Sequence, residues 1–107
     1  MKWFEKIIAA HTSVTDAVSH YERMKSERYF VWQEDGSGDG VEAESQHAEK
    51  TTTGTTDLFT KTEFDPWAED IERAFSDHGI AWYKNSVQHE EDTGFIHHEW
   101  VWEVVNG

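Results

Sequence analysis

The 107-residue sequence contains no cysteine, which excludes a disulfide framework and any thiolate nucleophile or metal ligand. It also lacks a run of about 18 apolar residues, so no membrane-spanning helix is predicted. The N-terminal segment has no long apolar stretch, because Glu5 and Lys6 interrupt it, and no signal peptide is expected. These absences are typical of a single cytosolic domain spanning residues 1–107.

Basic residues are also scarce. Nine Lys and Arg stand against 22 Asp and Glu, which gives a formal net charge of −13. Binding to a DNA backbone by counterion release needs clustered cations, so specific DNA binding is not expected. The charge leaves three interpretations: simple solubility, a basic protein partner, or a surface that does not adhere to DNA.

No arrangement of residues indicates catalysis, a cofactor or a metal. There is no serine in a nucleophile elbow, and the GSGDG segment is too acidic to cradle phosphate. His97 and His98 fall on opposite faces of a predicted strand, so only one could join His89 as a metal ligand. The acidic turn Glu90–Asp92 lacks the alternating ligands of a calcium loop. We therefore expect a protein that is not an enzyme.

The stretch from Thr53 to Gly79 predicts a strand, a sharp stop and an amphipathic helix. Its first part is rich in threonine, which suits a half-buried pleated surface. Asp65 is a good N-cap, and Pro66 is favoured at the first helical position because its missing N–H leaves no donor unpaired. Gly79 is a natural C-terminal stop.

The rest of the chain indicates an α+β fold, a mainly antiparallel β-sheet of about four strands with two to three helices packed on it. Residues 14–24 fit either a second helix or a short extended segment. The acidic, glycine-rich segment 34–47 predicts a flexible loop. The other predicted elements are a helix over 2–12, with His11 as a packing residue, strands over 28–33 and 49–61, a helix over 66–78, extended segments over 80–83 and 86–89, and a final strand over 95–105.

Aromatic residues make up 14% of the chain, including six tryptophans. Such large rings either fill the core or form part of an interface. Trp100 and Trp102 share one face of the last strand beside Trp82, which is consistent with a ligand-binding platform or with a core layer. The core is the favoured interpretation, because Trp67 and its neighbours on the predicted helix can cover it.

The sequence resembles the tail-completion and tail-terminator proteins of long-tailed phages and prophages over residues 28–105. Two segments carry the resemblance. The first is the TGTTDLFT run with Thr53, Gly54, Asp57, Leu58, Phe59 and Thr60, and the second is the closing hairpin with Thr93, Gly94, His97 or His98, Trp100 and Trp102.

This resemblance implies a small α+β subunit that forms a ring, commonly a hexamer, on the end of the tail tube. Its partners would be other copies of itself, the tail-tube protein and a head-connector protein. It would be assembled in the bacterial cytoplasm and reside in the tail or neck of the virion, with DNA passing nearby. An acidic channel wall would then give DNA nothing to adhere to.

Candidate subunit or tube contacts follow from exposed acidity and from surplus apolar surface. Strand 28–33 is apolar on both faces, so it is either central or lies at a subunit contact. The candidates are Tyr29 and Val31 from that strand, Asp35, Asp39, Glu42 and Glu44 from the acidic loop, and Glu90, Glu91 and Asp92 from the acidic turn. An acidic mimic of DNA that inhibits a DNA-binding protein is the alternative function, and a tryptophan-platform ligand-binding module is a third.

Overall fold

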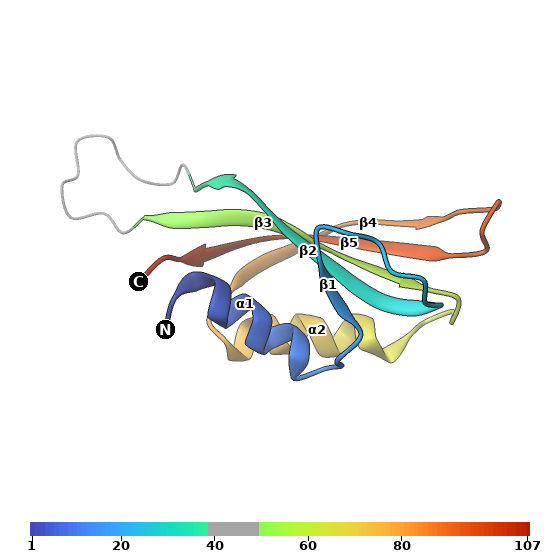
Figure 1. Ribbon diagram of the computed structural model, residues 1–107, viewed down its shortest axis with the longest axis horizontal. Helices are drawn as coiled ribbons and strands as arrows, with labels where there is room; N and C mark the ends of the chain where they lie inside the picture. The colour runs from blue at the N-terminus through green and yellow to red at the C-terminus, as the bar shows by residue number, and fades with distance from the viewer. Residues whose placement is uncertain (39–49) are drawn as a thin grey trace.

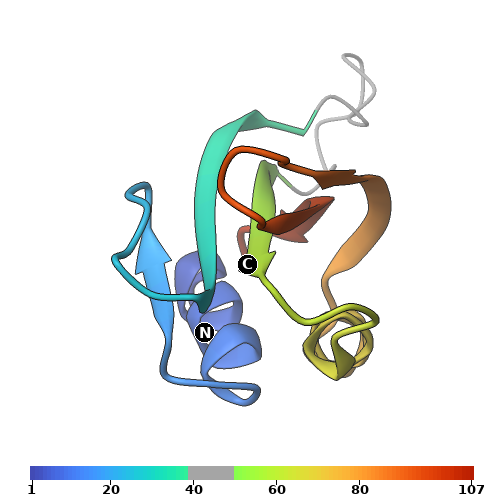
Figure 2. The ribbon, with the colours of Figure 1, turned by 90° about the vertical axis from the view of Figure 1, so that its right-hand side faces the viewer.

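The computed structural model describes residues 1–38 and 50–107, which form an α+β fold with both helices on one side of a sheet (Figures 1 and 2). Five strands make a mixed sheet in the order β1-β2-β3-β5-β4. The predicted fold class is confirmed, with one strand more than expected. The elements are α1 (Trp3–Thr12), β1 (Val18–His20), β2 (Arg28–Ser37), β3 (Thr51–Thr60), α2 (Pro66–Asp77), β4 (Ala81–His89) and β5 (Ile96–Val105).

The fifth strand comes from the segment that the sequence left ambiguous. Within residues 14–24, Val18–His20 are extended and pair in parallel with β2, with Val18 opposite Phe30. The strand ends at Tyr21, whose φ of 71° no β-strand accommodates. The extended interpretation of this segment is therefore correct at its centre.

Strand β2 is longer than predicted. It continues through a bulge between Glu34 and Gly36 and pairs with β3 as far as Ser37, opposite Thr52. The prediction of a flexible loop was therefore wrong for Glu34–Ser37. The acidic, glycine-rich composition of these residues indicated a loop. They are extended because the long, threonine-rich β3 offers backbone hydrogen-bonding groups with which they pair. Residues 39–47 of the predicted loop lie outside the described residues.

The stretch 53–79 has the predicted layout, and β3 forms the centre of the sheet between β2 and β5. The Asp65 carboxylate accepts a hydrogen bond from the Trp67 N–H at 2.9 Å and caps α2, with Pro66 at its first turn. Gly79 follows the helix at φ 71°, a left-handed conformation that favours glycine. Local signals were sufficient here because capping depends on neighbouring residues.

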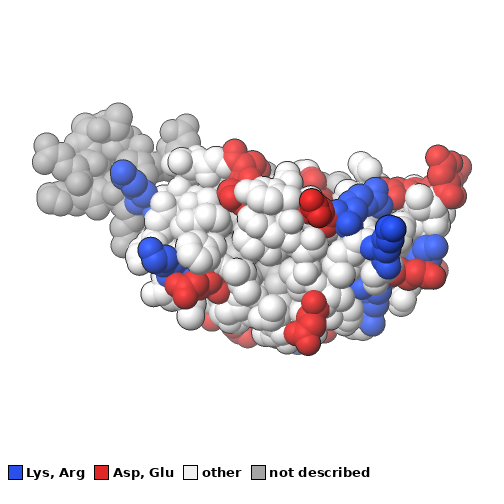
Figure 3. All heavy atoms as spheres, viewed as in Figure 1, with Lys and Arg blue, Asp and Glu red and all other residues white. Residues whose placement is uncertain are grey.

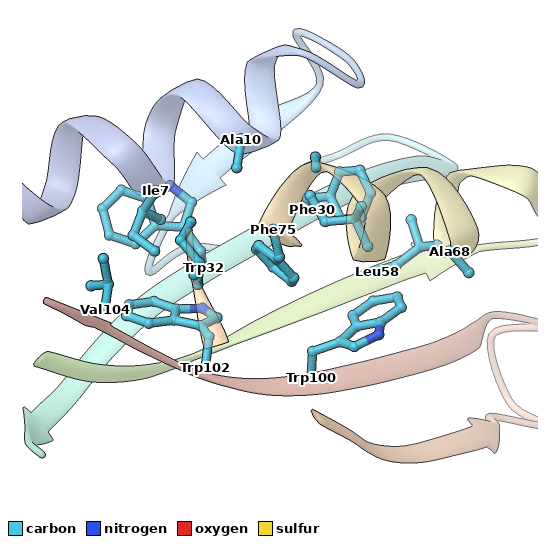
Figure 4. Close-up of a cluster of buried hydrophobic side chains, with 13 residues drawn as sticks. Ile7, Ala10, Phe30, Trp32, Leu58, Ala68, Phe75, Trp100, Trp102 and Val104 are labelled. Carbon is cyan, nitrogen blue, oxygen red and sulfur yellow. The ribbon is translucent and has the colours of Figure 1, made fainter. Parts of the chain in front are cut away.

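The main core lies between the sheet and the two helices (Figure 4). Trp100 and Trp102 are 0% and 1% exposed, so the core interpretation of this pair is confirmed. Trp82 lies opposite Trp102 on β4 and packs against the edge of this core. Among the residues that the structure describes, neither helix is long and apolar enough to cross a membrane.

A smaller apolar cluster lies on the other face of the sheet. Tyr29, Val31 and Phe59 form it and are at most 5% exposed, covered by Ala17, Met24 and Phe95 of the same chain. Tyr29 and Val31 are therefore removed from the surface that a partner could reach, which corrects their selection as candidate contacts. Their strand is apolar on both faces because the chain itself covers both.

Candidate functional site

The predicted acidic contacts lie at opposite ends of the sheet rather than together. Asp35 is exposed on β2, where it accepts a hydrogen bond from the Thr53 hydroxyl at 2.8 Å. Glu91 and Asp92 are exposed in the β4–β5 turn, beyond the other end of β5. The remaining acidic candidates, Asp39, Glu42 and Glu44, lie outside the described residues.

Glu90, the first residue of the acidic turn, is half-buried and forms ion pairs within the chain. Its carboxylate lies 3.6 Å from the Arg23 guanidinium and 3.8 Å from His97 Nδ1. His97 Nε2 lies 2.8 Å from the Asp57 carboxylate, and this hydrogen bond raises the pKa of His97 above its ordinary value although burial opposes the rise. Glu90 thus holds the β4–β5 turn to the connection between β1 and β2.

Basic side chains gather near this turn (Figure 3), and two of them lie over aromatic rings. The Arg23 guanidinium lies 4.1 Å from the centre of the Phe59 ring, and the Lys61 ammonium lies 5.0 Å from the centre of the Phe95 ring. Such cation–π contacts hold the charged groups at the surface while their stems cover apolar rings. The molecule is acidic overall, but several cations gather beside the acidic side chains at this end, which the sequence did not reveal because these residues are far apart along the chain.

Strand β4 is one edge of the sheet, and in the part of the chain that the structure describes no strand pairs with its outer side. It is nine residues long, and its side chains alternate around an open ladder of N–H and C=O groups. Tyr83 and Val87 are 58% and 52% exposed. A long edge with exposed apolar residues is a template for pairing with another chain.

The opposite edge, at β1, borders an apolar groove of about 470 Å³ between this strand and α1. Phe4 and Ile8 of α1 are 39% and 43% exposed along it. His20 stacks between the rings of Tyr21 and Trp32, with ring centres 3.7 and 3.9 Å away. Glu34 binds both His20 and the Tyr21 hydroxyl, and the latter bond lowers the pKa of Glu34 below its ordinary value.

In residues 1–38 and 50–107 no group of three His, Asp or Glu side chains is arranged to hold a metal ion. His97 points to the outer face and His98 into the core side, as their alternation predicts. No protein-family model matches the chain, and no curated protein matches it.

Proposed function

We propose that the chain is a non-enzymatic structural subunit of a phage or prophage tail, a tail terminator or tail-completion protein that assembles into a ring at the end of the tail tube. The observation that carries this proposal is the pair of complementary open edges on one sheet. One edge, β4, offers unpaired backbone groups with Tyr83 exposed, and the other offers the apolar groove beside β1. The resemblance of residues 28–105 to tail proteins supports the kind of assembly.

Two different surfaces on opposite edges favour a head-to-tail contact. Such a heterologous contact generates a ring when its rotation closes, whereas one self-complementary surface gives only a dimer. Neither surface includes the buried Tyr29 and Val31, so the contact does not require the monomer to unfold. We therefore assign the subunit contact to β4 of one copy and the α1–β1 groove of the next.

The DNA-mimic alternative receives less support. On the face shown in Figure 3, acidic side chains are scattered among neutral ones, and basic side chains lie among them at both ends. A mimic of duplex DNA would need rows of carboxylates with phosphate-like spacing. The acidic charge is better used beside passing DNA, which it would repel.

The head-to-tail contact is tested with two variants and their mixture. Ile8→Lys places a charge in the groove, and Tyr83→Lys places one at the β4 edge, while Thr62→Lys in the exposed β3–α2 loop is the control. Light scattering after size exclusion, over a concentration series with and without the tail-tube protein, measures the mass. Each edge variant alone should fail to form rings, and their equimolar mixture should form dimers through the one intact contact. A wild-type chain that stays monomeric in every condition contradicts the proposal.

The tail role is tested by electron microscopy of particles that lack the protein. Abnormally long tails indicate that it terminates tube growth. Normal tails detached from filled heads indicate that it joins the tail to the head. Particles with normal, attached tails contradict both roles.

A further inference from the structure

His98 is a buried histidine whose ring nitrogens have no hydrogen-bond partner. It lies on β5, where its cross-strand neighbours are Leu58 on β3 and Val87 on β4, and it is 7% exposed. Within residues 1–38 and 50–107, neither Nδ1 nor Nε2 finds a donor or acceptor. Burying an imidazole N–H without a partner is costly, so such a group in a folded protein calls for an explanation.

A small pocket of about 170 Å³ lies against this histidine, between the start of α2 and strands β4 and β5. Its lining residues are Phe64, Asp65, Ala68, Glu69, Lys84 and His98. The Lys84 ammonium lies 5.1 Å from the centre of the Trp100 ring, on which His98 also stacks with ring centres 5.8 Å apart. A cation and an unpaired imidazole therefore both lie close to the Trp100 indole.

Phe64 adds a second anomaly to the same pocket. Its backbone has φ of 53°, a left-handed conformation that is strained for a bulky residue, and its side chain is 91% exposed. Strained residues persist where the surrounding structure holds them, and they cluster at binding sites. An exposed aromatic ring, a strained backbone and an unpaired histidine thus converge at one opening.

The charged groups around His98 decide which ligand fits. Asp65 is already bound by Arg28 and by the Thr60 hydroxyl, and Glu72 of α2 accepts the Trp100 N–H. Burial, followed by the charge of Lys84, lowers the pKa of His98, and the carboxylates of Asp65 and Glu72 and the neighbouring His97 act on it more weakly. Glu69 lines the pocket from the first turn of α2 and is exposed.

Lys84 forms no ion pair with the described residues, although the chain has a large excess of carboxylates. Its positive charge repels a metal ion from His98, so the unpaired imidazole is not suited to metal binding. A ligand with two acceptor oxygens on one carbon satisfies both groups, because one oxygen can bind the His98 N–H and the other the Lys84 ammonium.

We propose that this pocket is a carboxylate-binding site in which His98 and Lys84 each donate to one oxygen and the Phe64 ring covers the ligand. Its small volume suits the end of an Asp or Glu side chain. The histidine nitrogens are covered in the free chain, so entry of a ligand requires a rearrangement of the side chains around them. Lys84 belongs to β4, so the pocket lies beside the proposed ring contact, but neither Ile8 nor Tyr83 lines it, and the two ring variants leave its lining unchanged.

Acetate is the probe. The imidazole resonances of the whole chain are followed by proton–carbon NMR, with the His98 signal assigned through His98→Gln, while sodium acetate replaces sodium chloride at constant ionic strength. We expect a saturable shift confined to His98 among the histidines, with its pKa moved upward because a bound anion favours the protonated ring. An acetate titration indistinguishable from chloride at His98 overturns the proposal without any variant.

Lys84→Met tests the second donor, because it keeps the aliphatic stem and removes the charge. Lys61→Met is the matched control, since the Lys61 ammonium also lies 5.0 Å from the centre of an aromatic ring but Lys61 does not line the pocket. Losing a charge-assisted hydrogen bond should weaken acetate binding about tenfold in the first variant and not in the control. Equal acetate affinity in Lys84→Met and the wild type overturns the assignment of Lys84.

A dilution series without acetate identifies the natural source of the carboxylate. If the His98 signal in concentrated protein moves toward its acetate-bound position and returns on dilution, a second copy of the chain occupies the pocket. If acetate shifts the signal but protein concentration does not, the carboxylate belongs to a different molecule. Both results support the site and assign its partner.

Discussion

His11 provides a sharp test of the core because it is fully buried and fully hydrogen-bonded. Its Nδ1 lies 2.7 Å from the Ile7 carbonyl oxygen, and its Nε2 lies 2.9 Å from the Thr56 hydroxyl, which also accepts the Trp102 N–H at 3.0 Å. A carbonyl oxygen only accepts, so Nδ1 carries the proton, and in the neutral ring Nε2 accepts from the Thr56 hydroxyl. These contacts accommodate a neutral ring, and full burial confirms the role of His11 as a packing residue.

Protonation of His11 opposes folding. Burial lowers the pKa of His11 from 6.5 to about 4, although the bond to the Ile7 carbonyl favours the charged ring. Between these two pKa values the unfolded chain binds a proton that the folded chain does not, so stability falls as the pH falls. From pH 7 to pH 5 the contribution of His11 to the free energy of unfolding should decrease by about 2 kcal/mol, a large share of the stability of a small domain.

The measurement compares wild type with His11→Gln, whose amide can bind the Ile7 carbonyl and Thr56 but does not titrate. Urea unfolding followed by tryptophan fluorescence at pH 7 and pH 5 gives four free energies of unfolding. The other titrating groups are common to both proteins, so the difference between the two pH effects isolates His11. The wild type should lose about 2 kcal/mol more than the variant on acidification. Losses equal to within about 0.5 kcal/mol would refute a buried neutral His11.

Three further substitutions test the scaffold by urea unfolding. Asp65→Ala should lower the free energy of unfolding by about 3 kcal/mol, because it removes the α2 cap and leaves Arg28 without its carboxylate partner. A decrease below about 1 kcal/mol contradicts this role. Gly54→Ala should cost more than about 2 kcal/mol, since its Cβ would lie 2.4 Å from a strand carbonyl and 2.4 Å from an indole ring. Gly36→Ala is its control, with 3.6 Å to the nearest atom, and equal costs for the two would contradict the crowding argument. Phe64→Asn should raise the free energy of unfolding by about 1 kcal/mol, because asparagine adopts the left-handed conformation with less strain than phenylalanine. A loss of stability would show that the backbone at this position is not strained.

The sequence was informative where the determinants are local. The N-cap Asp65, Pro66 at the first helical position and the stop at Gly79 specify α2 through neighbours only a few residues away. The alternation in β5 likewise places its tryptophans on one face, because a strand has a period of two. Such signals do not depend on the rest of the fold, and the predicted elements therefore agree with the structure.

Pairing between segments that are distant along the chain could not be predicted from the sequence in the same way. Arg28 and Thr60 are cross-strand neighbours, and this register brings the cations of two separate segments to one end of the sheet. Glu34–Ser37 have a loop-like composition and become a strand only because β3 is long enough to pair with them. Tyr29 was predicted to be a contact residue because the sequence alone does not show whether an apolar face is covered by a partner or by the same chain. In the structure Phe95 of the same chain covers it.

The central strand β3 and the two outer strands of the sheet differ in their polar groups, and this difference links the scaffold to its use. Central β3 carries polar groups that are paired: Thr56 with His11, Thr60 with Asp65, and Asp57 with His97. The open hydrogen-bonding edges lie instead on the outer strands β1 and β4, with the exposed Ile8, Tyr83 and Val87 on or beside them. Stability and association therefore depend on different residues. Lysine at Ile8 or Tyr83 should change association and leave the urea midpoint nearly unchanged, because exposed sites rarely shift stability by more than about 0.5 kcal/mol.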